Sequence, residues 1–351
     1  MKYFDIISND SRSPIAILAR VGLRLLTIPY GIAIYCRNKW FDKHSSASTR
    51  ISIPVISVGN ITVGGTGKTP LVEFISRYLR QQQIRVTLVS RGYGSKEGKP
   101  NDEALELERK LPDVPHLQNP DRVAAARMAI AEFEAQLILL DDAFQHRRIK
   151  RDLDIVLIDA TCPFGYGHLL PRGLLREPLR NLKRADLIAI TRVDQISTEQ
   201  CQKLEKHIKH LNATADIVSF SHAITGIENN SGTQQGLSHI SGKRIIAFCG
   251  IGNPQVFHDM LVQQGLHIVH FESFADHHDY QRTDILRLVE LAETHQTTTF
   301  ICTHKDLVKI QVNHLGVAEL WALSIAVTPT CGANEFTAAL DTIITTIPTD
   351  E

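Results

Sequence analysis

The stretch SVGNITVGGTGKTPLVEF, residues 57–74, decides the fold class of this 351-residue chain. An apolar strand ends at Val58, a glycine-rich loop follows, and the next residues have the apolar spacing of a helix. Strand, glycine loop and helix in this order form the context in which such a loop binds a nucleotide phosphate. The apolar face expected on that helix consists of Leu71, Val72, Ile75 and Leu79.

The loop has the composition of a phosphate cradle. Its glycines allow main-chain N–H groups to converge on phosphate oxygens at a helix N-terminus, where the helix dipole also favours an anion. We expect Lys68 to reach the β- and γ-phosphates of ATP and the Thr69 hydroxyl to bind Mg²⁺. Thr62 stands where the usual pattern begins with glycine, and a glycine-rich turn without a ligand is the alternative. The predicted nucleotide-binding residues are Thr62, Val63, Gly64, Gly65, Thr66, Gly67, Lys68 and Thr69.

Short runs rich in β-branched residues alternate with longer helical patterns along the chain. The runs are almost continuously apolar, as in a parallel sheet that helices cover on both faces. We therefore expect a P-loop NTPase-like, doubly wound α/β core with a mostly parallel sheet, and a smaller second α/β domain. The polar, glycine-rich segment at 226–242 indicates either the boundary between them or a long surface connection. The expected division is an N-terminal helix region at 1–45, a P-loop core at 46–225 and a C-terminal domain at 226–351.

Two carboxylates follow the apolar run LILL at 137–140. Asp141 and Asp142 would lie at the carboxyl end of a strand, where open α/β sheets bind their ligands. One of them would hold Mg²⁺ directly or through water, as the second acidic element of P-loop enzymes does. An ordinary solvated turn is the alternative, and the phosphate loop upstream favours the metal site.

The most apolar stretch of the chain lies near its N-terminus. As a helix, residues 15–35 would be about 32 Å long, which is enough to cross a bilayer. Arg20 and Arg24 would each cost roughly 2.5 to 3.5 kcal/mol near the hydrocarbon centre, and their spacing places them on one helix face. We therefore expect an amphipathic helix at a membrane surface, where the basic residues that follow attract anionic headgroups. A helix packed on the protein's own core is the alternative.

Composition argues against several classes of protein. The chain has 38 basic and 38 acidic residues, so it lacks the positive surplus that a general nucleic-acid binder needs. Its six cysteines include no C-x-x-C pair, which is typical of reduced thiols rather than of a disulfide framework or a zinc knot. We expect a protein without disulfides that does not bind nucleic acid.

Six motifs occur in a fixed order: GNITVGGTGKTP, SRGYG at 90–94, DDAFQHRR, LLPRGLLREPL, GIGNPQVF and FADHHDY. This ordered set resembles the tetraacyldisaccharide 4′-kinase family, the lipid A 4′-kinases of Gram-negative bacteria. The resemblance extends from the N-terminal helix to about residue 310. It is specific, because the phosphate loop occurs in many families and the ordered set does not.

The resemblance implies an enzyme that transfers the γ-phosphate of ATP to the 4′-hydroxyl of a tetraacyldisaccharide 1-phosphate, forming lipid IVA in lipid A biosynthesis. It implies ATP and Mg²⁺ as cofactors. The implied partners are the lipid A precursor and an anionic membrane surface, with no nucleic acid and no protein partner. The implied location is the cytoplasmic face of the bacterial inner membrane, where the N-terminal helix would hold the enzyme peripherally.

The resemblance also implies the residues that act on the acceptor. The acidic pair of the family falls on Asp102 and Glu103, and its Asp-His pair falls on Asp276 and His277. We expect Asp102 to be the base for the acceptor hydroxyl, supported by a hydrogen bond to His277. The alternative for Asp102 is a solvated acid on the surface. The alternative for the DHHD cluster is a metal site, although its histidines lack the spacing of zinc ligands. The chain departs from the family pattern at Asn101, Ala104, Ala143 and His304.

Arg176 and Glu177 match the Arg-Glu pair that follows the P-R-G turn of the family. Arg176 would stabilise the γ-phosphate during transfer, and Glu177 would help to hold Mg²⁺. The basic residues around them suit a sugar phosphate or anionic headgroups, or else form a solvated helix face. The implied catalytic set is Asp102, His277, Lys68 and Arg176, and the implied metal set is Thr69, Asp141, Asp142 and Glu177.

The residues alone leave two other functions open. A P-loop GTPase or metallochaperone-type NTPase would couple hydrolysis to a conformational change, and AITRVD and CTHKD partly match the guanine signature without its asparagine. A membrane-bound nucleotide sensor would bind the nucleotide in order to regulate a partner. A preference for GTP, or ATP hydrolysis indifferent to added lipid, would favour these alternatives.

Overall fold

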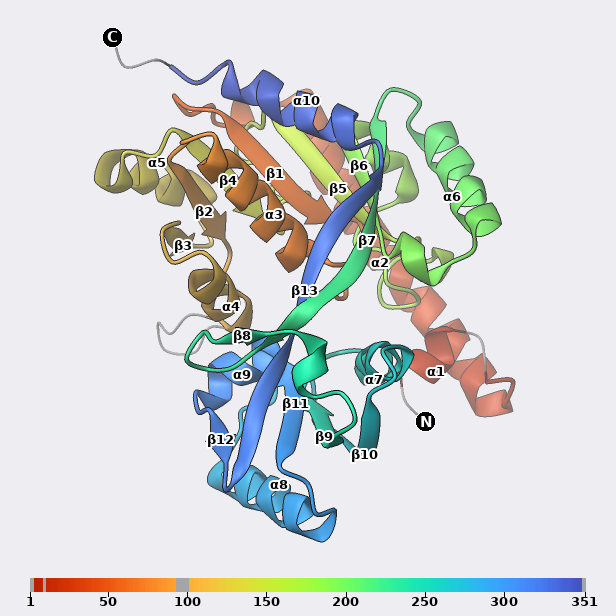
Figure 1. Ribbon diagram of the computed structural model, residues 1–351. Coiled ribbons are helices and arrows are strands. Elements are labelled where there is room, and N and C mark those ends of the chain that lie inside the picture. The colour runs from red at the N-terminus through yellow and green to blue at the C-terminus, as the bar shows by residue number, and fades with distance from the viewer. Residues whose placement is uncertain (1–2, 9–10, 93–100, 349–351) are drawn as a thin grey trace. The chain divides into compact units, whose positions relative to one another are not determined.

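The computed structural model describes residues 3–8, 11–92 and 101–348 (Figure 1). The chain divides into two compact units. The first unit contains the described residues up to 92, residues 113–222 and the residues from 327 onward, and the second contains 101–112 and 223–326. Strands β7 (Asp216–Glu228) and β13 (Ala318–Cys331) each continue from one unit into the other. The contiguous domain boundaries expected from the sequence stay a prediction.

Parallel strands form the sheet of the first unit. Neighbours in the order β7, β6, β5, β1, β4, β2, β3 all pair in parallel. Every residue of the five strands from β6 to β2 in that order is buried, as expected for strands that are covered on both faces. The expected doubly wound α/β core is therefore confirmed. The bounds are β1 Val55–Asn60, β2 Val86–Ser90, β3 His116–Gln118, β4 Leu137–Asp141, β5 Leu153–Asp159 and β6 Leu187–Thr191.

Helices supply the rest of this core. The alanines of α5 pack with Ile138 and Leu140 of β4, and Leu204 and Ile208 of α6 pack with Ile188 of β6. The face expected on α3 is confirmed, because all four of its predicted apolar residues are fully buried. The helices of this unit are α1 Tyr3–Ile7, α2 Pro14–Lys43, α3 Lys68–Gln81, α5 Arg122–Phe133, α6 Thr198–Leu211 and α10 Ala333–Ile344.

The second unit is a smaller α/β assembly. Strands β10, β9, β11 and β13 pair in parallel in that order, whereas β12 pairs antiparallel with β13 and β8 with β7. The expectation of a smaller second α/β assembly is confirmed. The strands are β8 Gln234–Gln235, β9 Arg244–Cys249, β10 His267–Ser273, β11 Thr299–Thr303 and β12 His314–Leu315. The helices are α4 Asp102–Lys110, α7 Pro254–Gln263, α8 Arg282–Thr294 and α9 His304–Ile310.

Helix α2 is the long N-terminal helix expected from the sequence. Its start is fixed by Ser13, whose hydroxyl accepts a hydrogen bond from the Ala16 N–H at 3.2 Å, and by Pro14 in the first turn. The helix is long and apolar enough to cross a membrane, a test that core helices and signal sequences of other proteins also pass. In α2, however, only 6% of the most apolar 18-residue window is buried. A core helix would bury most of that window.

The two faces of α2 are reversed relative to an ordinary surface helix. The face turned toward the protein carries polar groups, among them Thr27, Tyr30 and the buried Asn38. The outward face carries large apolar side chains that are 52 to 75% exposed. Soluble proteins place the apolar stripe against the core, so this arrangement favours a helix that meets an apolar environment. The exposed apolar residues are Ile15, Ile17, Leu18, Val21, Leu25, Leu26, Ile28 and Ile32.

Candidate functional site

The phosphate loop connects β1 to α3 in the first unit. Gly64 and Gly67 have φ values of +116° and +84°, which glycine adopts without strain. Gly67 is the N-cap of α3, and no side chain caps the first turn of this helix. The N–H groups of that first turn therefore point toward the phosphate loop without a side-chain acceptor. A Cβ atom at Gly64 or Gly65 would meet nothing within 4 Å. The loop thus has the open, amide-rich geometry that suits a phosphate group.

Side chains from neighbouring strand ends hold the backbone of this loop. Thr191 donates from Oγ1 to the Thr66 oxygen at 2.8 Å, and Arg192 donates from Nη2 to the Gly65 oxygen at 2.8 Å. Both come from the segment AITRVD, which the sequence presented only as a partial guanine signature. Their role could not be found from local pattern, because the strand that carries them is distant in sequence from the loop.

The imidazole of His222 also packs against the phosphate loop. A Cβ atom added to Gly67 would lie 2.8 Å from His222 Nε2, so the imidazole lies directly against the loop backbone. Neither ring nitrogen has a hydrogen-bond partner among the residues that the structure describes. Burial, reinforced by the Arg192 guanidinium, lowers the pKa of His222 to about 4. The ring is therefore neutral at pH 7.

Asp142 joins two of the predicted site residues. Its Oδ1 lies 3.5 Å from Lys68 Nζ, and its Oδ2 lies 2.8 Å from Arg176 Nη1. Asp142 follows β4 with φ of +51°, a conformation that is uncommon outside glycine and that turns the side chain toward the loop. Burial alone would raise the pKa of Asp142, but Lys68 and Arg176 outweigh it and lower the pKa to about 2. The carboxylate is thus ionised between two cations.

The side chains expected to bind Mg²⁺ differ in their surroundings. Asp141 is buried at the end of β4, and Thr69 is buried in the first turn of α3. Within residues 3–8, 11–92 and 101–348, no group of three or more His, Cys, Asp or Glu side chains could hold a metal by itself. Mg²⁺ in nucleotide sites takes one or two protein carboxylates, water and phosphate oxygens. Binding of Mg²⁺ by Thr69, Asp141 and Asp142 together with a nucleotide stays a prediction.

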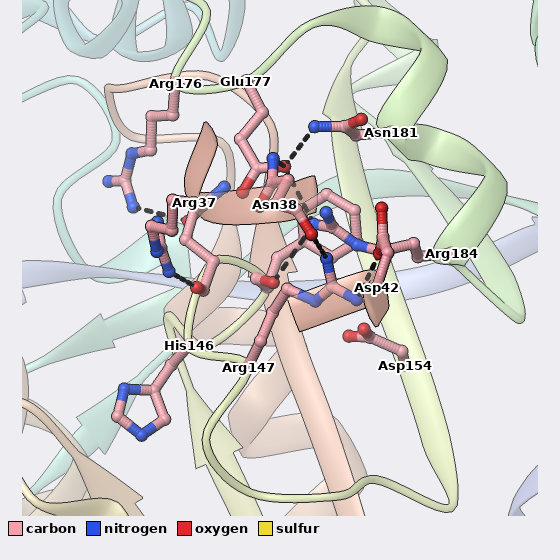
Figure 2. Close-up of polar contacts among 12 residues, drawn as sticks. Arg37, Asn38, Asp42, His146, Arg147, Asp154, Arg176, Glu177, Asn181 and Arg184 are labelled. Carbon is pink, nitrogen blue, oxygen red and sulfur yellow. Dashed lines mark hydrogen bonds and ion pairs between the residues drawn. The ribbon is translucent and has the colours of Figure 1, made fainter. Parts of the chain in front are cut away.

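Glu177 has a different environment, which Figure 2 shows. Its Oε2 accepts hydrogen bonds from Asn181 at 2.6 Å and from Asn38 of α2 at 3.2 Å, and it pairs with Arg184 at 2.9 Å. The side chain is fully buried. These contacts bring Glu177 together with α2 and the turn Leu179–Arg184. Its predicted contact with Mg²⁺ stays a prediction, and its observed partners support a role in holding α2.

More polar contacts join α2 to the segment after Asp142. Arg147 donates to the Asn38 oxygen at 3.1 Å and pairs with Asp42 at 2.7 Å, while Arg37 donates to the Gln145 oxygen (Figure 2). Gln145 in turn donates to the main-chain oxygen of Asn60 at 2.8 Å, where the phosphate loop begins. The polar face of α2 is thus bonded to the segments that position the loop and Asp142.

The second unit brings together the two acceptor-side residues. Asp102 Oδ2 lies 3.0 Å from His277 Nδ1. Asp102 is the first residue of α4, and the Asn101 side chain caps that helix by accepting from the Ala104 N–H at 3.0 Å. Asn101 and Ala104, which depart from the family pattern, are thus compatible with a capped helix start. Asp276 is 3.9 Å from the other ring nitrogen of His277.

The histidines of the DHHD segment have separate carboxylate partners, Asp102 for His277 and Asp284 for His278, and they gather no metal-binding group within the described part of the chain. All six cysteines are free. The last two residues of the SRGYG motif, 93–94, lie outside the described residues.

The sequence of this chain matches a known protein family. The family model for the tetraacyldisaccharide-1-P 4′-kinase, LpxK, matches residues 19–345. A tetraacyldisaccharide 4′-kinase of Halothermothrix orenii is 36% identical over 335 residues, covering 87% of each chain. That of Syntrophus aciditrophicus is 35% identical over 327 residues, covering 86% of each chain.

A solved structure agrees with the sequence relatives. The crystal structure of LpxK from Aquifex aeolicus in complex with ATP matches with a TM-score of 0.74 and 26% sequence identity. The match covers 93% of this chain and 99% of that one. Ordered motifs, fold and loop geometry thus lead to one conclusion: this chain belongs to the tetraacyldisaccharide-1-P 4′-kinase family.

Proposed function

We infer that this protein transfers the γ-phosphate of ATP to the 4′-hydroxyl of a tetraacyldisaccharide 1-phosphate, forming lipid IVA in lipid A biosynthesis. The observation that carries the inference is the family match over residues 19–345, which includes both the phosphate loop and the Asp102–His277 pair. The crystal structure of the Aquifex aeolicus relative, which was solved with ATP, supports ATP as the phosphate donor. The first turn of α3, which has no side-chain cap, supports the same choice.

The first unit supplies the groups for the nucleotide. Residues 62–69 would surround the phosphates, with Lys68 on the β- and γ-phosphates. Arg176 would neutralise charge on the phosphoryl group in transfer, a task for which its pairing with Asp142 orients it. Thr69, Asp141 and Asp142 would hold Mg²⁺, which supplies positive charge to the phosphates when bound.

The second unit supplies the group for the acceptor. Asp102 would take the proton of the 4′-hydroxyl as its oxygen attacks the γ-phosphorus and ADP leaves. His277, at 3.0 Å from the carboxylate, would fix its orientation. The proton, the new P–O bond and the departing ADP then account for every atom of the transfer.

The reversed faces of α2 support a peripheral attachment to the membrane that contains the acceptor lipid. The outward apolar side chains would enter the acyl region, and Lys39 and Lys43 would lie near anionic headgroups. The family's substrate is a lipid A precursor, so we place the enzyme at the cytoplasmic face of the bacterial inner membrane. No protein partner and no nucleic acid is needed for this activity.

The test is a transfer assay. Purified protein is incubated with ATP labelled in the γ-phosphate and with the tetraacyldisaccharide 1-phosphate in mixed micelles, and label in the lipid is measured. The wild-type protein should label the lipid, and Asp102→Ala and Lys68→Ala should each reduce labelling by at least about 100-fold. Label found only in inorganic phosphate at a rate indifferent to lipid would instead identify an NTPase.

A further inference from the structure

Two ion pairs lie side by side between α4 and α9 of the second unit. Lys305 Nζ lies 2.9 Å from Glu103 Oε1, and Lys309 Nζ lies 2.6 Å from Asp102 Oδ2. The two lysines are four residues apart and therefore share one face of α9, while the two acids are consecutive at the start of α4. Only one of the pairs includes the proposed base. The Lys305–Glu103 pair, which lacks the base, is therefore a matched control for the Lys309–Asp102 pair.

Lys309 is held between two segments that the proposed reaction needs. Only 10% of its side chain is exposed. Besides its contact with Asp102, its Nζ donates to the main-chain oxygen of His278 at 3.0 Å. His278 is the residue after His277, so a single ammonium group holds both the base and the segment that carries its imidazole partner.

Both neighbours of Asp102 act on the same carboxylate oxygen. Oδ2 lies 3.0 Å from His277 Nδ1 and 2.6 Å from Lys309 Nζ. In the part of the chain that the structure describes, both of these contacts reach Oδ2 and neither reaches Oδ1. A carboxylate fixed through one oxygen has the direction of its other oxygen fixed as well, which leaves Oδ1 as the proton acceptor.

The backbone at His277 depends on such contacts. His277 has φ of +57°, a conformation that costs free energy outside glycine and persists only where the surroundings hold it. Its N–H donates to the Gly250 oxygen at 3.2 Å, and the next ring, His278, bonds through Nε2 to Asp284 at 2.9 Å. The contact from Lys309 to the His278 oxygen is a third restraint on this turn.

We propose that Lys309 is a positioning residue for phosphoryl transfer, which fixes Asp102 Oδ2 and the His277 backbone so that Asp102 Oδ1 faces the acceptor hydroxyl. This inference rests on the proposed function, in which Asp102 takes the hydroxyl proton. In the step, the hydroxyl oxygen bonds to the γ-phosphorus, the bond to ADP breaks, and the proton moves to Asp102 Oδ1. Lys309 keeps its own protons throughout and acts only through Asp102 and His277.

Three single variants test the role. Lys309→Met removes the ammonium group and keeps the length of the side chain. It should lower kcat about 10- to 100-fold while KM for ATP and for the lipid changes less than about threefold, because a misplaced base affects the chemical step. Lys309→Arg restores a cationic donor and should recover most of the loss. Lys305→Met removes the neighbouring pair and should retain kcat near that of the wild type.

A double variant separates positioning from a general loss of structure. If Lys309 acts through Asp102, Asp102→Asn combined with Lys309→Met should have the same kcat as Asp102→Asn alone. Losses that multiply, or an unchanged kcat in Lys309→Met, would overturn the proposal. If Lys309→Met does not fold by circular dichroism, Lys309→Gln takes its place in the same cycle, since it keeps a donor without the charge. Full activity of Asp102→Asn would refute the proposed base itself, an outcome distinct from failure of Lys309 alone.

Discussion

The hydroxyl of Tyr30 donates a hydrogen bond to the main-chain oxygen of Arg176, 2.9 Å away. The N–H of Arg176 in turn donates to the Ile61 oxygen at 2.8 Å, at the start of the phosphate loop. A helix whose apolar side faces outward is therefore bonded to the arginine that pairs with Asp142. This bond links the position of α2 to the geometry of the site.

Tyr30→Phe should lower kcat about fivefold, because loss of a hydrogen bond worth about 1 kcal/mol frees the Arg176 backbone. The measurement is lipid phosphorylation on vesicles that contain the acceptor. Tyr35→Phe is the control, since Tyr35 is exposed on the same helix and its hydroxyl accepts a hydrogen bond from Lys39 of that helix, at 3.2 Å. Equal rates for the two variants would show that the bond has no part in catalysis.

Glu177→Gln should lower the free energy of unfolding by about 3 kcal/mol, because Arg184 would remain largely buried without its counter-charge. Urea unfolding of both proteins measures this change. The control is Glu199→Gln, which breaks an ion pair between Glu199 and Lys203, whose side chains are 76% and 72% exposed respectively. This change should lower the free energy of unfolding by less than about 1 kcal/mol. A Glu177→Gln protein with normal stability and weakened Mg²⁺ affinity would instead support the metal-ligand role.

The neutral His222 should make stability depend on pH. Its pKa is about 4 in the folded protein against 6.5 unfolded, so the unfolded state binds the proton more readily as pH falls from 6.5 to 4. Stability is therefore lost over that window, by about 2 kcal/mol at pH 5 relative to pH 7. His222→Gln should remove this part of the pH dependence in urea unfolding. His210→Gln, at an exposed position on α6, should leave it unchanged.

Substitutions on the outward face of α2 should release the protein from membranes without changing its fold. Leu18 and Leu25 are 74 and 62% exposed, and each would contribute roughly 1.5 to 3 kcal/mol on burial in lipid. Leu18→Ser with Leu25→Ser should thus reduce vesicle binding in sedimentation while the melting temperature stays constant. This pair is a sharper test than deletion of residues 1–40, which would also remove the buried Asn38. Unchanged sedimentation would exclude attachment through this face.

Local pattern was sufficient to predict the phosphate loop, the buried face of α3 and the apolar strands of the first sheet. Each depends on residues that are close in sequence, where spacing and β-branched content carry the signal. No sequence pattern indicates strand β3, because its three half-buried residues, His116–Gln118, have neither the length nor the apolar content of a strand pattern. The long strand β7 also lacks a clear pattern, because its exposed and buried positions mix irregularly.

Contacts between segments that are distant in the chain could not be predicted from the sequence. Nothing in the spacing indicates that Lys309 reaches Asp102, or that Thr191 and Arg192 hold the phosphate loop. The N-terminal helix was predicted, but its inward polar face was not, because hydropathy shows which side is apolar and not which side the protein covers. The residues implied for the acceptor come from family resemblance, since an acid in the first turn of a helix has no pattern that marks it as a base.

The close approach of His222 to Gly67 has a consequence for mutational scanning. Any side chain at position 67 must adopt φ of +84° and displace an imidazole 2.8 Å away, so replacements there will fail even in a screen that scores only folding. Position 65 has open space and no such backbone demand. Intolerance at 67 therefore reports steric necessity, whereas a folded but inactive alanine at 65 would report the ligand.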